Sequence, residues 1–427
     1  MLSRSPRLRR ILFAYTVNEL GTWFGYVALA LGVYDHTRSA IATAALFVAR
    51  GLLPALLAPV LVARTERSAR AGRLAWLYLV EAALAVALAA ALSSFWLPAV
   101  LVLVAVDGIA AVAATALVRA SVARLAAEEA QAAPELGPAD RQEFAAAAQR
   151  RANATLNVSF MVSLAVGPAL GGVLTHAFGG PAALLIDALS FLICAALMLG
   201  VRSYVEEALE DSVRARLVVA WRHIWEMPQL RVLLITEAVA VVVFASVEPV
   251  EVIYAKSTLG AGDAGFGLLV GSWGVGAAAG AVLFARSSRR PLAPLLMGGT
   301  LFVGLAYLGF AAAPSLAIAC AAAVLGGIGN GVQWPALISA VQQLTPSSLQ
   351  GRLMSAVGSM NALCPAIGFA LGGTIATVGS PRAAMTVAGV VATLATAAFV
   401  RPSIRGLALQ GEPEQRRVGA STGAVVP

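Results

Sequence analysis

Charged residues are scarce in this chain of 427 residues, since only 12% are Asp, Glu, Lys or Arg. A soluble domain carries about 25% charged and about 45–50% apolar residues. Here 59% of the residues are apolar and the mean hydropathy is +0.82. This composition excludes an ordinary cytosolic enzyme, a disordered chain and a collagen-like chain, and is typical of a protein that lies mostly within a membrane.

Cysteine, histidine and lysine are also rare. The three cysteines lie inside apolar stretches and the three histidines lie on separate segments, so the sequence predicts no disulfide framework, no metal site and no cofactor. Lys256 is the only lysine, and it follows Ala255 rather than the glycine-rich loop that binds the phosphates of ATP. No nucleophile elbow, zinc motif or dinucleotide fingerprint is present. We therefore predict that the protein is not an enzyme.

Long apolar runs fill the rest of the sequence. A helix needs about 20 mostly apolar residues to cross a bilayer, and twelve such runs occur between charged or turn residues. We expect an all-α membrane protein with twelve transmembrane helices. The runs cover residues 11–33, 40–63, 74–94, 98–118, 154–178, 182–201, 232–254, 265–285, 295–313, 316–340, 353–377 and 383–400.

The basic residues divide unevenly between the two sides that these spans define. Of the 30, 26 fall in the termini and alternate loops, three (Arg38, Lys256 and Arg382) fall on the opposite side, and Arg50 lies within a span. Because cytoplasmic loops retain positive charge, both termini are expected in the cytoplasm. The net charge of +8 is then a sign of topology, and nucleic acid is not an expected partner.

The two halves of the chain repeat each other. Gly167–Gly172 aligns with Gly368–Gly373 at an offset of 201 residues. A duplicated six-helix unit is the architecture of transporters that rock two bundles around a central site. We predict an N-terminal six-helix bundle at 1–201, a linker at 202–231, a C-terminal six-helix bundle at 232–401 and a cytoplasmic tail at 402–427.

Two cytoplasmic segments do not belong to the spans. Residues 126–147 form an acidic insertion rich in alanine and proline, which we expect to be a solvated helix or a flexible strap. The linker carries apolar residues on one helical face, which predicts a helix lying in the membrane interface. These residues are Leu217, Val218, Trp221, Ile224 and Trp225.

Four motifs stand out along the chain. They are Tyr34–Ala40, Arg50–Pro54, Gly267–Gly276 and a Gly-Pro-x-x-Gly-Gly run at 167–172, which is similar to an antiporter signature. In these motifs the sequence resembles the major facilitator superfamily, and most closely its twelve-span macrolide-efflux-like drug:proton antiporters. This resemblance implies the two-bundle fold, drug efflux, drug resistance and a place in the plasma membrane of a bacterium.

The resemblance also implies gating residues. Arg64 and Arg67 fit the family's Gly-x-x-x-Asp-Arg-x-x-Arg loop after the second span, although Ala63 occupies the aspartate position. In the fifth span, small residues permit a kink and a close approach between helices. These are Gly167, Pro168, Gly171 and Gly172.

Acidic side chains inside the spans are the candidates for chemistry, because a charge in hydrocarbon costs at least a few kcal/mol. A buried carboxyl group takes up a proton more readily than one in water. An excess of buried acids therefore suits protons or organic cations, and among basic residues only Arg50 opposes them. The acids are Glu19, Glu81, Asp107, Asp187, Glu237, Glu248 and Glu251.

Glu19 is the strongest candidate, with Tyr15, Thr22 and Tyr26 on the same helical stripe. A polar stripe within a span faces a cavity or a partner, because lipid would leave it unsatisfied. The resemblance implies that the first, fourth, seventh and tenth spans line a cavity, which also favours Asp107. For both acids, a structural hydrogen bond is the alternative role.

Other candidates support these two. Glu237 and Glu248 lie on one face of the seventh span, and we expect them to assist. We expect Arg50 to pair with Asp107, Glu19 or Glu81, because an unpaired buried guanidinium would be too costly. The polar face of the tenth span is explained either by cavity lining or by packing, and consists of Asn330, Gln333 and Trp334.

The sequence thus predicts a monomeric secondary transporter that exports small amphipathic or cationic compounds in exchange for protons by alternating access. Its expected partners are the small-molecule substrate, protons and the lipid bilayer. Two alternatives stay open. The substrate could be a siderophore, an endogenous metabolite or a lysophospholipid, or the protein could be a non-transporting receptor or scaffold that docks partners through residues 126–147.

Overall fold

The computed structural model describes residues 6–65, 72–131, 137–201, 221–287 and 290–408. Within these ranges the chain forms twelve long α helices and one π-helical segment, with no strand. The elements are α1 (Pro6–Thr37), α2 (Ala40–Thr65), α3 (Arg73–Ser93), α4 (Leu97–Gln131), α5 (Pro138–Phe178), α6 (Gly180–Met198), α8 (Pro228–Ile253), η1 (Tyr254–Thr258), α9 (Gly262–Arg286), α10 (Leu292–Ala312), α11 (Leu316–Gln343), α12 (Ser347–Val378) and α13 (Pro381–Ala408).

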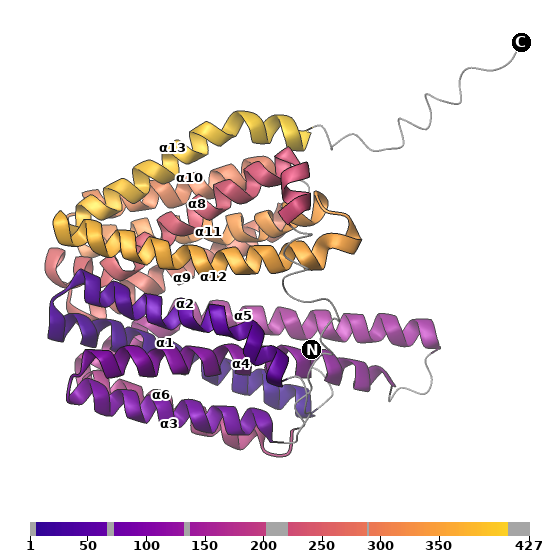
Figure 1. Cartoon of the computed structure of the whole chain (residues 1–427), viewed down its shortest axis with the longest axis horizontal. Coiled ribbons are helices and arrows are strands. Elements are labelled where there is room, and N and C mark those ends of the chain that lie inside the picture. The colour runs from indigo at the N-terminus through magenta and orange to yellow at the C-terminus, as the bar shows by residue number, and fades with distance from the viewer. Residues whose placement is uncertain (1–5, 66–71, 132–136, 202–220, 288–289, 409–427) are drawn as a thin grey trace, which may run out of the picture.

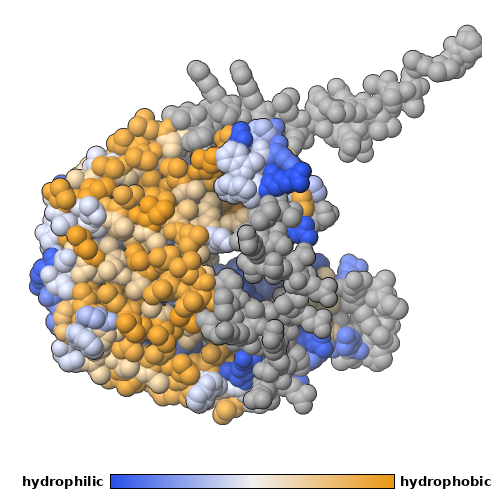
Figure 2. All heavy atoms as spheres, viewed as in Figure 1, coloured by the Kyte–Doolittle hydropathy of each residue, from blue (hydrophilic) through white to orange (hydrophobic). Residues whose placement is uncertain are grey.

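Each predicted span coincides with one of these long helices, so the all-α architecture is confirmed. Ten helices in the described ranges are long and apolar enough to cross a membrane, and α1 and α13 are not among the ten. The count of twelve spans stays a prediction. Hydrophobic side chains cover the broad middle of the face drawn in Figure 2, as expected of a surface in contact with lipid.

The helices lie in two groups that follow the order of the chain. Figure 1 shows α1–α6 in the lower part and α8–α13 in the upper part. Packing between the groups is dominated by α5 against α9 and by α2 against α12. A buried cluster draws on both groups, with Val27, Leu31 and Phe47 from the first and Ile253 and Phe266 from the second.

The three basic residues expected on the sparsely charged side lie at one end of the molecule. Lys256 and Arg38 both contact Asp35. Arg382 interacts electrostatically with Tyr254, two residues before Lys256, and its Nη2 donates a hydrogen bond to the carbonyl oxygen of Ala313. We call this the Lys256 end and the opposite end the arginine-rich end. Which membrane face each end adjoins stays a prediction.

The helices α4 and α5 are longer than a membrane span. Their 35 and 41 residues correspond to about 52 and 62 Å at 1.5 Å per residue, whereas the hydrocarbon core is about 30 Å thick. Figure 1 shows α5 reaching beyond the other helices at the right. The acidic insertion at 126–147 therefore includes the end of α4, up to Gln131, and the beginning of α5, from Pro138, whereas its residues 132–136 lie outside the described residues.

The predicted interfacial helix is described only from Trp221 onward, so Leu217 and Val218 lie outside the described residues. Residues 221–226 are helical, and Trp221 and Trp225 are 62% and 50% exposed. The guanidinium of Arg231 lies 5.1 Å from the ring centroid of Trp225. Exposed tryptophans beside an arginine are typical of a membrane–water interface.

Candidate functional site

A cavity of about 1410 Å³ lies between the two groups of helices. Residues of α1, α4 and α5 line one side, and residues of α8 to α13 line the other. On α5 the lining runs from Asn157 to Val166, and on α11 it runs from Asn330 to Ser339. These are the parts of α5 and α11 nearer the arginine-rich end. Figure 2 shows an indentation between the two groups at that end.

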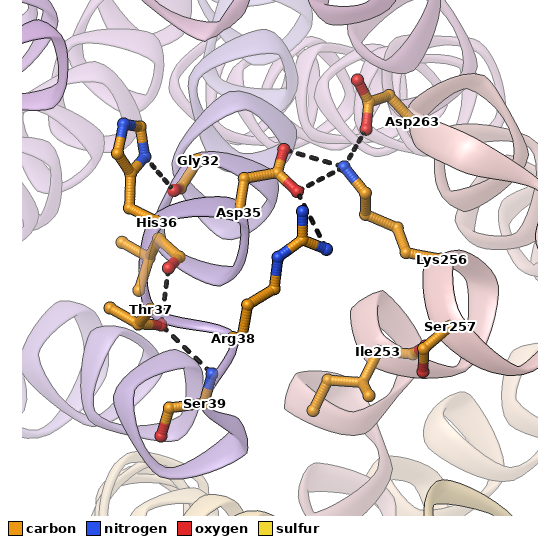
Figure 3. Close-up of polar contacts among 11 residues, drawn as sticks. Gly32, Asp35, His36, Thr37, Arg38, Ser39, Ile253, Lys256, Ser257 and Asp263 are labelled. Atoms are coloured by element: carbon orange, nitrogen blue, oxygen red, sulfur yellow. Dashed lines mark hydrogen bonds and ion pairs between the residues drawn. The ribbon is translucent and has the colours of Figure 1, made fainter.

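The Lys256 end is held shut by ionic contacts across the two groups, which we call the Lys256 bridge (Figure 3). Lys256 Nζ lies 2.6 Å from Oδ1 of Asp35 on α1 and 2.5 Å from Oδ1 of Asp263 on α9. The Lys256 side chain is only 15% exposed. Arg38 lies 4.0 Å from Asp35 and is 68% exposed, so it adds little.

Close helix packing reinforces this closure. A Cβ atom on Gly172 of α5 would lie 2.7 Å from the carbonyl oxygen of Asp263 and 3.0 Å from Cα of Gly267 on α9. The repeat-related Gly373 of α12 has the same role, because its Cβ would lie 2.7 Å from Cβ of Ala44 on α2. The cavity is therefore closed at the Lys256 end by both charge and packing.

The predicted gating residues fall into separate places. Gly172 lies between the two groups, whereas Gly167 and Gly171 pack against α1 within the first group. The carbonyl oxygen of Pro168 lies against Gly267 of α9. Arg64 is in the last turn of α2, but its side chain and the whole of Arg67 lie outside the described residues.

The predicted stripe on α1 reaches the cavity with one exception. Tyr15, Glu19 and Tyr26 line it, whereas Thr22 does not. The Tyr15 hydroxyl donates a hydrogen bond to the Glu19 carboxylate. Arg119 of α4 lines the same side and interacts electrostatically with both residues. Glu19 is therefore a cavity group that already has a donor and a nearby positive charge.

The opposite side of the cavity carries the predicted polar residues of α8 and α11. Gln333 Nε2 donates a hydrogen bond of 3.1 Å to Oε2 of Glu237. Both side chains line the cavity, together with Asn330 and Trp334. This contact ties α8 to α11 and satisfies one oxygen of a buried carboxylate.

Further along α8, Glu248 and Glu251 also line the cavity. We call them the α8 carboxylate pair. They interact electrostatically with each other, and both act on Tyr26 of α1 and Tyr307 of α10. The sequence favoured Glu248 over Glu251, but the structure places both on the cavity wall.

Asp107 does not line the cavity, contrary to the role expected of it, and Arg50 does not line it either. Asp107 instead interacts electrostatically with Glu81 of α3 and Asp187 of α6, inside the first group of helices. We call these three acids the buried acid group. Asp187 lies beside α1, where a Cβ atom on Gly21 would be 2.6 Å from its Oδ1.

Arg50 does not form the expected direct pair with Asp107, Glu19 or Glu81, since no such contact of 4.0 Å or less is found in the described residues. Its guanidinium lies 5.7 Å from the ring centroid of Tyr26. Its charge is instead shared at longer range with Glu19 and the buried acid group.

A comparison with family profiles found a match that covers most of the chain. The profile of the Major Facilitator Superfamily matches residues 11–255 and 233–423. The chain belongs to the Major Facilitator Superfamily. This major facilitator is a transporter, with twelve helices in the described residues that fit the family's fold.

Solved structures agree with this assignment of the fold. The nucleoside transporter NupG superposes with a TM-score of 0.71 at 10% identity, over 93% of this chain and 99% of that chain. A POT family transporter in complex with a thioalcohol-conjugated peptide gives 0.67 at 14% identity, over 93% and 96%. A bacterial homologue of the human lysosomal transporter Spinster gives 0.66 at 13% identity, over 96% and 100%.

A comparison with curated proteins found no match. The three structural relatives are a nucleoside transporter, a transporter with a bound peptide conjugate and a homologue of a lysosomal transporter. At identities of 10% to 14% they show the fold of this major facilitator and not its substrate.

Metal binding finds no support in the part of the chain that the structure describes, where no group of three or more His, Cys, Asp or Glu side chains could hold an ion.

Sequence reasoning missed Arg119 on the cavity wall and the role of Lys256. The signal for Lys256 was available, because it is the only lysine and lies on the sparsely charged side. Its partners Asp35 and Asp263 carried no signal, because they are brought to it by the fold.

Proposed function

We propose that this major facilitator exports small amphipathic or cationic compounds in exchange for protons, by alternating access across the plasma membrane of a bacterium. The observation that carries the proposal is the charge of the cavity wall. In the described part of the chain, four glutamates line the cavity and one arginine opposes them. They are Glu19, Glu237, Glu248 and Glu251, with Arg119 as the cation. A wall with this balance attracts positive charge, as protons or as organic cations.

The two six-helix bundles, 1–201 and 232–401, are proposed to rock against each other around this cavity. The Lys256 bridge and the Gly172–Gly267 contact support a state that is closed at the Lys256 end. With both termini in the cytoplasm, as the arginine distribution predicts, the cavity of this state faces inward. Opening the Lys256 end while closing the other would release substrate outside.

Proton coupling is assigned to Glu19 and Asp107, with Arg50 as their shared partner. Arg50 interacts electrostatically with both carboxyl groups, although only Glu19 lines the cavity. A proton or a cationic substrate on Glu19 neutralises its charge, which frees Arg50 to act more strongly on Asp107. In this scheme the two acids do not compete in one place, and Arg50 carries the signal between them.

A liposome experiment tests this proposal. Purified protein is reconstituted with a pH-sensitive dye in the lumen, and a gradient of a lipophilic cation such as ethidium is imposed. Ethidium movement is expected to drive protons in the opposite direction. In Glu19→Gln, which cannot release a proton, the coupled proton flux should fall at least about tenfold, equivalent to about 1.4 kcal/mol.

The matched control is Glu226→Gln, because Glu226 is 59% exposed and pairs with Arg222 at the surface. It should retain the proton flux of the unmodified protein. Cation movement without protons would contradict the exchange mechanism. Unchanged proton flux in Glu19→Gln would contradict the assignment of Glu19.

A further inference from the structure

We infer that the α8 carboxylate pair forms a subsite for aromatic dications, in which Glu248 and Glu251 each bind one positive centre while the ring of the ligand stacks on the neighbouring aromatic side chains. The inference rests on the proposed export of cations. Beyond that proposal, it states that the positive charge of the ligand binds on the second group of helices rather than at Glu19. It also states which cations bind best.

The geometry of the pair suits two charges. Glu248 and Glu251 are three residues apart on α8, and residues at this spacing lie on the same face of a helix with Cβ atoms about 5–6 Å apart. Both line the cavity. Tyr26 and Tyr307 lie close enough to interact electrostatically with both carboxylates, one from each group of helices.

Within the described ranges, no basic side chain pairs with either carboxylate. In the described residues no hydrogen bond or ion pair is formed by Glu248 or Glu251, and no arginine or lysine acts on them electrostatically. The nearby cations are engaged elsewhere, since Lys256 binds Asp35 and Asp263 and Arg50 lies over Tyr26.

The other two acids of the cavity differ in this respect. Glu19 accepts a hydrogen bond from Tyr15 and has Arg119 nearby, and Glu237 accepts one from Gln333. Two unbalanced carboxylates in a site of low dielectric are costly. The α8 carboxylate pair is therefore the part of the wall that gains most from a bound positive charge.

Aromatic side chains beside the pair indicate the rest of the ligand. The rings of Trp273 and Tyr307 are stacked, with centroids 5.7 Å apart and planes 14° from parallel. Phe244 lies 5.5 Å from Trp273, and all three residues line the cavity. Tyr307 and Trp273 are only 1% and 8% exposed and are stacked on each other, so they support Phe244 from behind. Phe244 is the partly exposed ring of the three, and an exposed aromatic face binds a flat cationic ring through stacking and cation–π attraction.

A ligand with one charge would leave one of these carboxylates unbalanced, whereas a ligand with two charges balances both. Ethidium and propidium form a matched pair of probes for this difference. They share the cationic phenanthridinium ring, and propidium carries a second, quaternary ammonium centre on a short arm. Both fluoresce more strongly when bound in an apolar site.

The experiment measures the binding of each dye to purified full-length protein by fluorescence titration at pH 8. Propidium is expected to bind at least about tenfold more tightly than ethidium, the scale of one added charge-assisted contact. In Glu248→Gln or Glu251→Gln, propidium should lose this advantage and bind about as ethidium does. The double variant should lose most affinity for both dyes, while Glu226→Gln should keep the tenfold preference.

Several results would overturn the inference. Equal binding of the two dyes to the unmodified protein would do so without any variant. An unchanged preference for propidium in the double variant would show that the charge binds elsewhere, and size-exclusion profiles establish that each variant is folded. If neither dye binds while another cation still drives proton flux in liposomes, the subsite is wrong and the proposed function stands. If no cation drives flux, the proposed function itself fails.

Discussion

A Lys256→Met variant is expected to populate the state that is open at the Lys256 end. Among the residues that the structure describes, Lys256 is the only side chain that joins Asp35 of α1 to Asp263 of α9, and it is 15% exposed. Without it the two carboxylates repel each other across the boundary between the groups. Loss of this bridge should shift the equilibrium by about 1–3 kcal/mol, or about 5- to 150-fold.

Distances between spin labels measure this shift. Ser94 and Ser380 are exposed residues at the Lys256 end, one in each group of helices, and each can be changed to cysteine in a protein without its three native cysteines. Longer distances should become frequent in Lys256→Met. The matched control is Arg38→Met, because the contact between Arg38 and Asp35 is long and exposed and contributes at most about 1 kcal/mol. Equal distance distributions in both variants would refute the closing role of Lys256.

A Gly267→Ala variant should open the same end by a different cause. A Cβ atom at position 267 would clash with the carbonyl oxygen of Pro168 and lie 3.0 Å from Cα of Gly172, and backbone atoms of α5 cannot move aside cheaply. Overpacking of this kind costs about 1–3 kcal/mol, and here the cost falls on the closed state. We expect longer spin-label distances and a lower thermal stability.

Gly298 of α10 provides the matched control, because a Cβ atom there meets nothing within 4 Å. In a helix interior, alanine is about 1 kcal/mol more favourable than glycine. Gly298→Ala should therefore be neutral or stabilising, opposite in sign to Gly267→Ala. If Gly267→Ala were also stabilising and left the distances unchanged, the close contact between α5 and α9 would not control the conformation.

The fold was largely predictable because each transmembrane helix is specified locally. A run of about 20 apolar residues must form a helix in a bilayer, where its own backbone is the only partner for its polar groups. The predicted ends were less accurate where helices leave the membrane. The fifth span was expected at 154–178, whereas α5 begins at Pro138, because helix propensity continues into the solvated alanine-rich segment.

The candidate site was predictable only in part. The spacing of Tyr15, Glu19 and Tyr26 placed them on one face of α1, and that face lines the cavity. The same reasoning put Thr22 on the wall, and the family resemblance put Asp107 in the cavity, but neither lies there. Helical spacing shows which residues share a face, but it does not show which neighbouring helix covers that face.

The sequence by itself determined the helices and the set of acidic residues within the expected spans, because these follow from hydropathy and charge along the chain. Only the tertiary structure decided which acids reach the cavity and which of them are already satisfied. It also brought Lys256 to Asp35, which is 221 residues away in the chain. Such contacts depend on how twelve helices tilt and pack together, and packing is a property of the whole assembly rather than of any single segment.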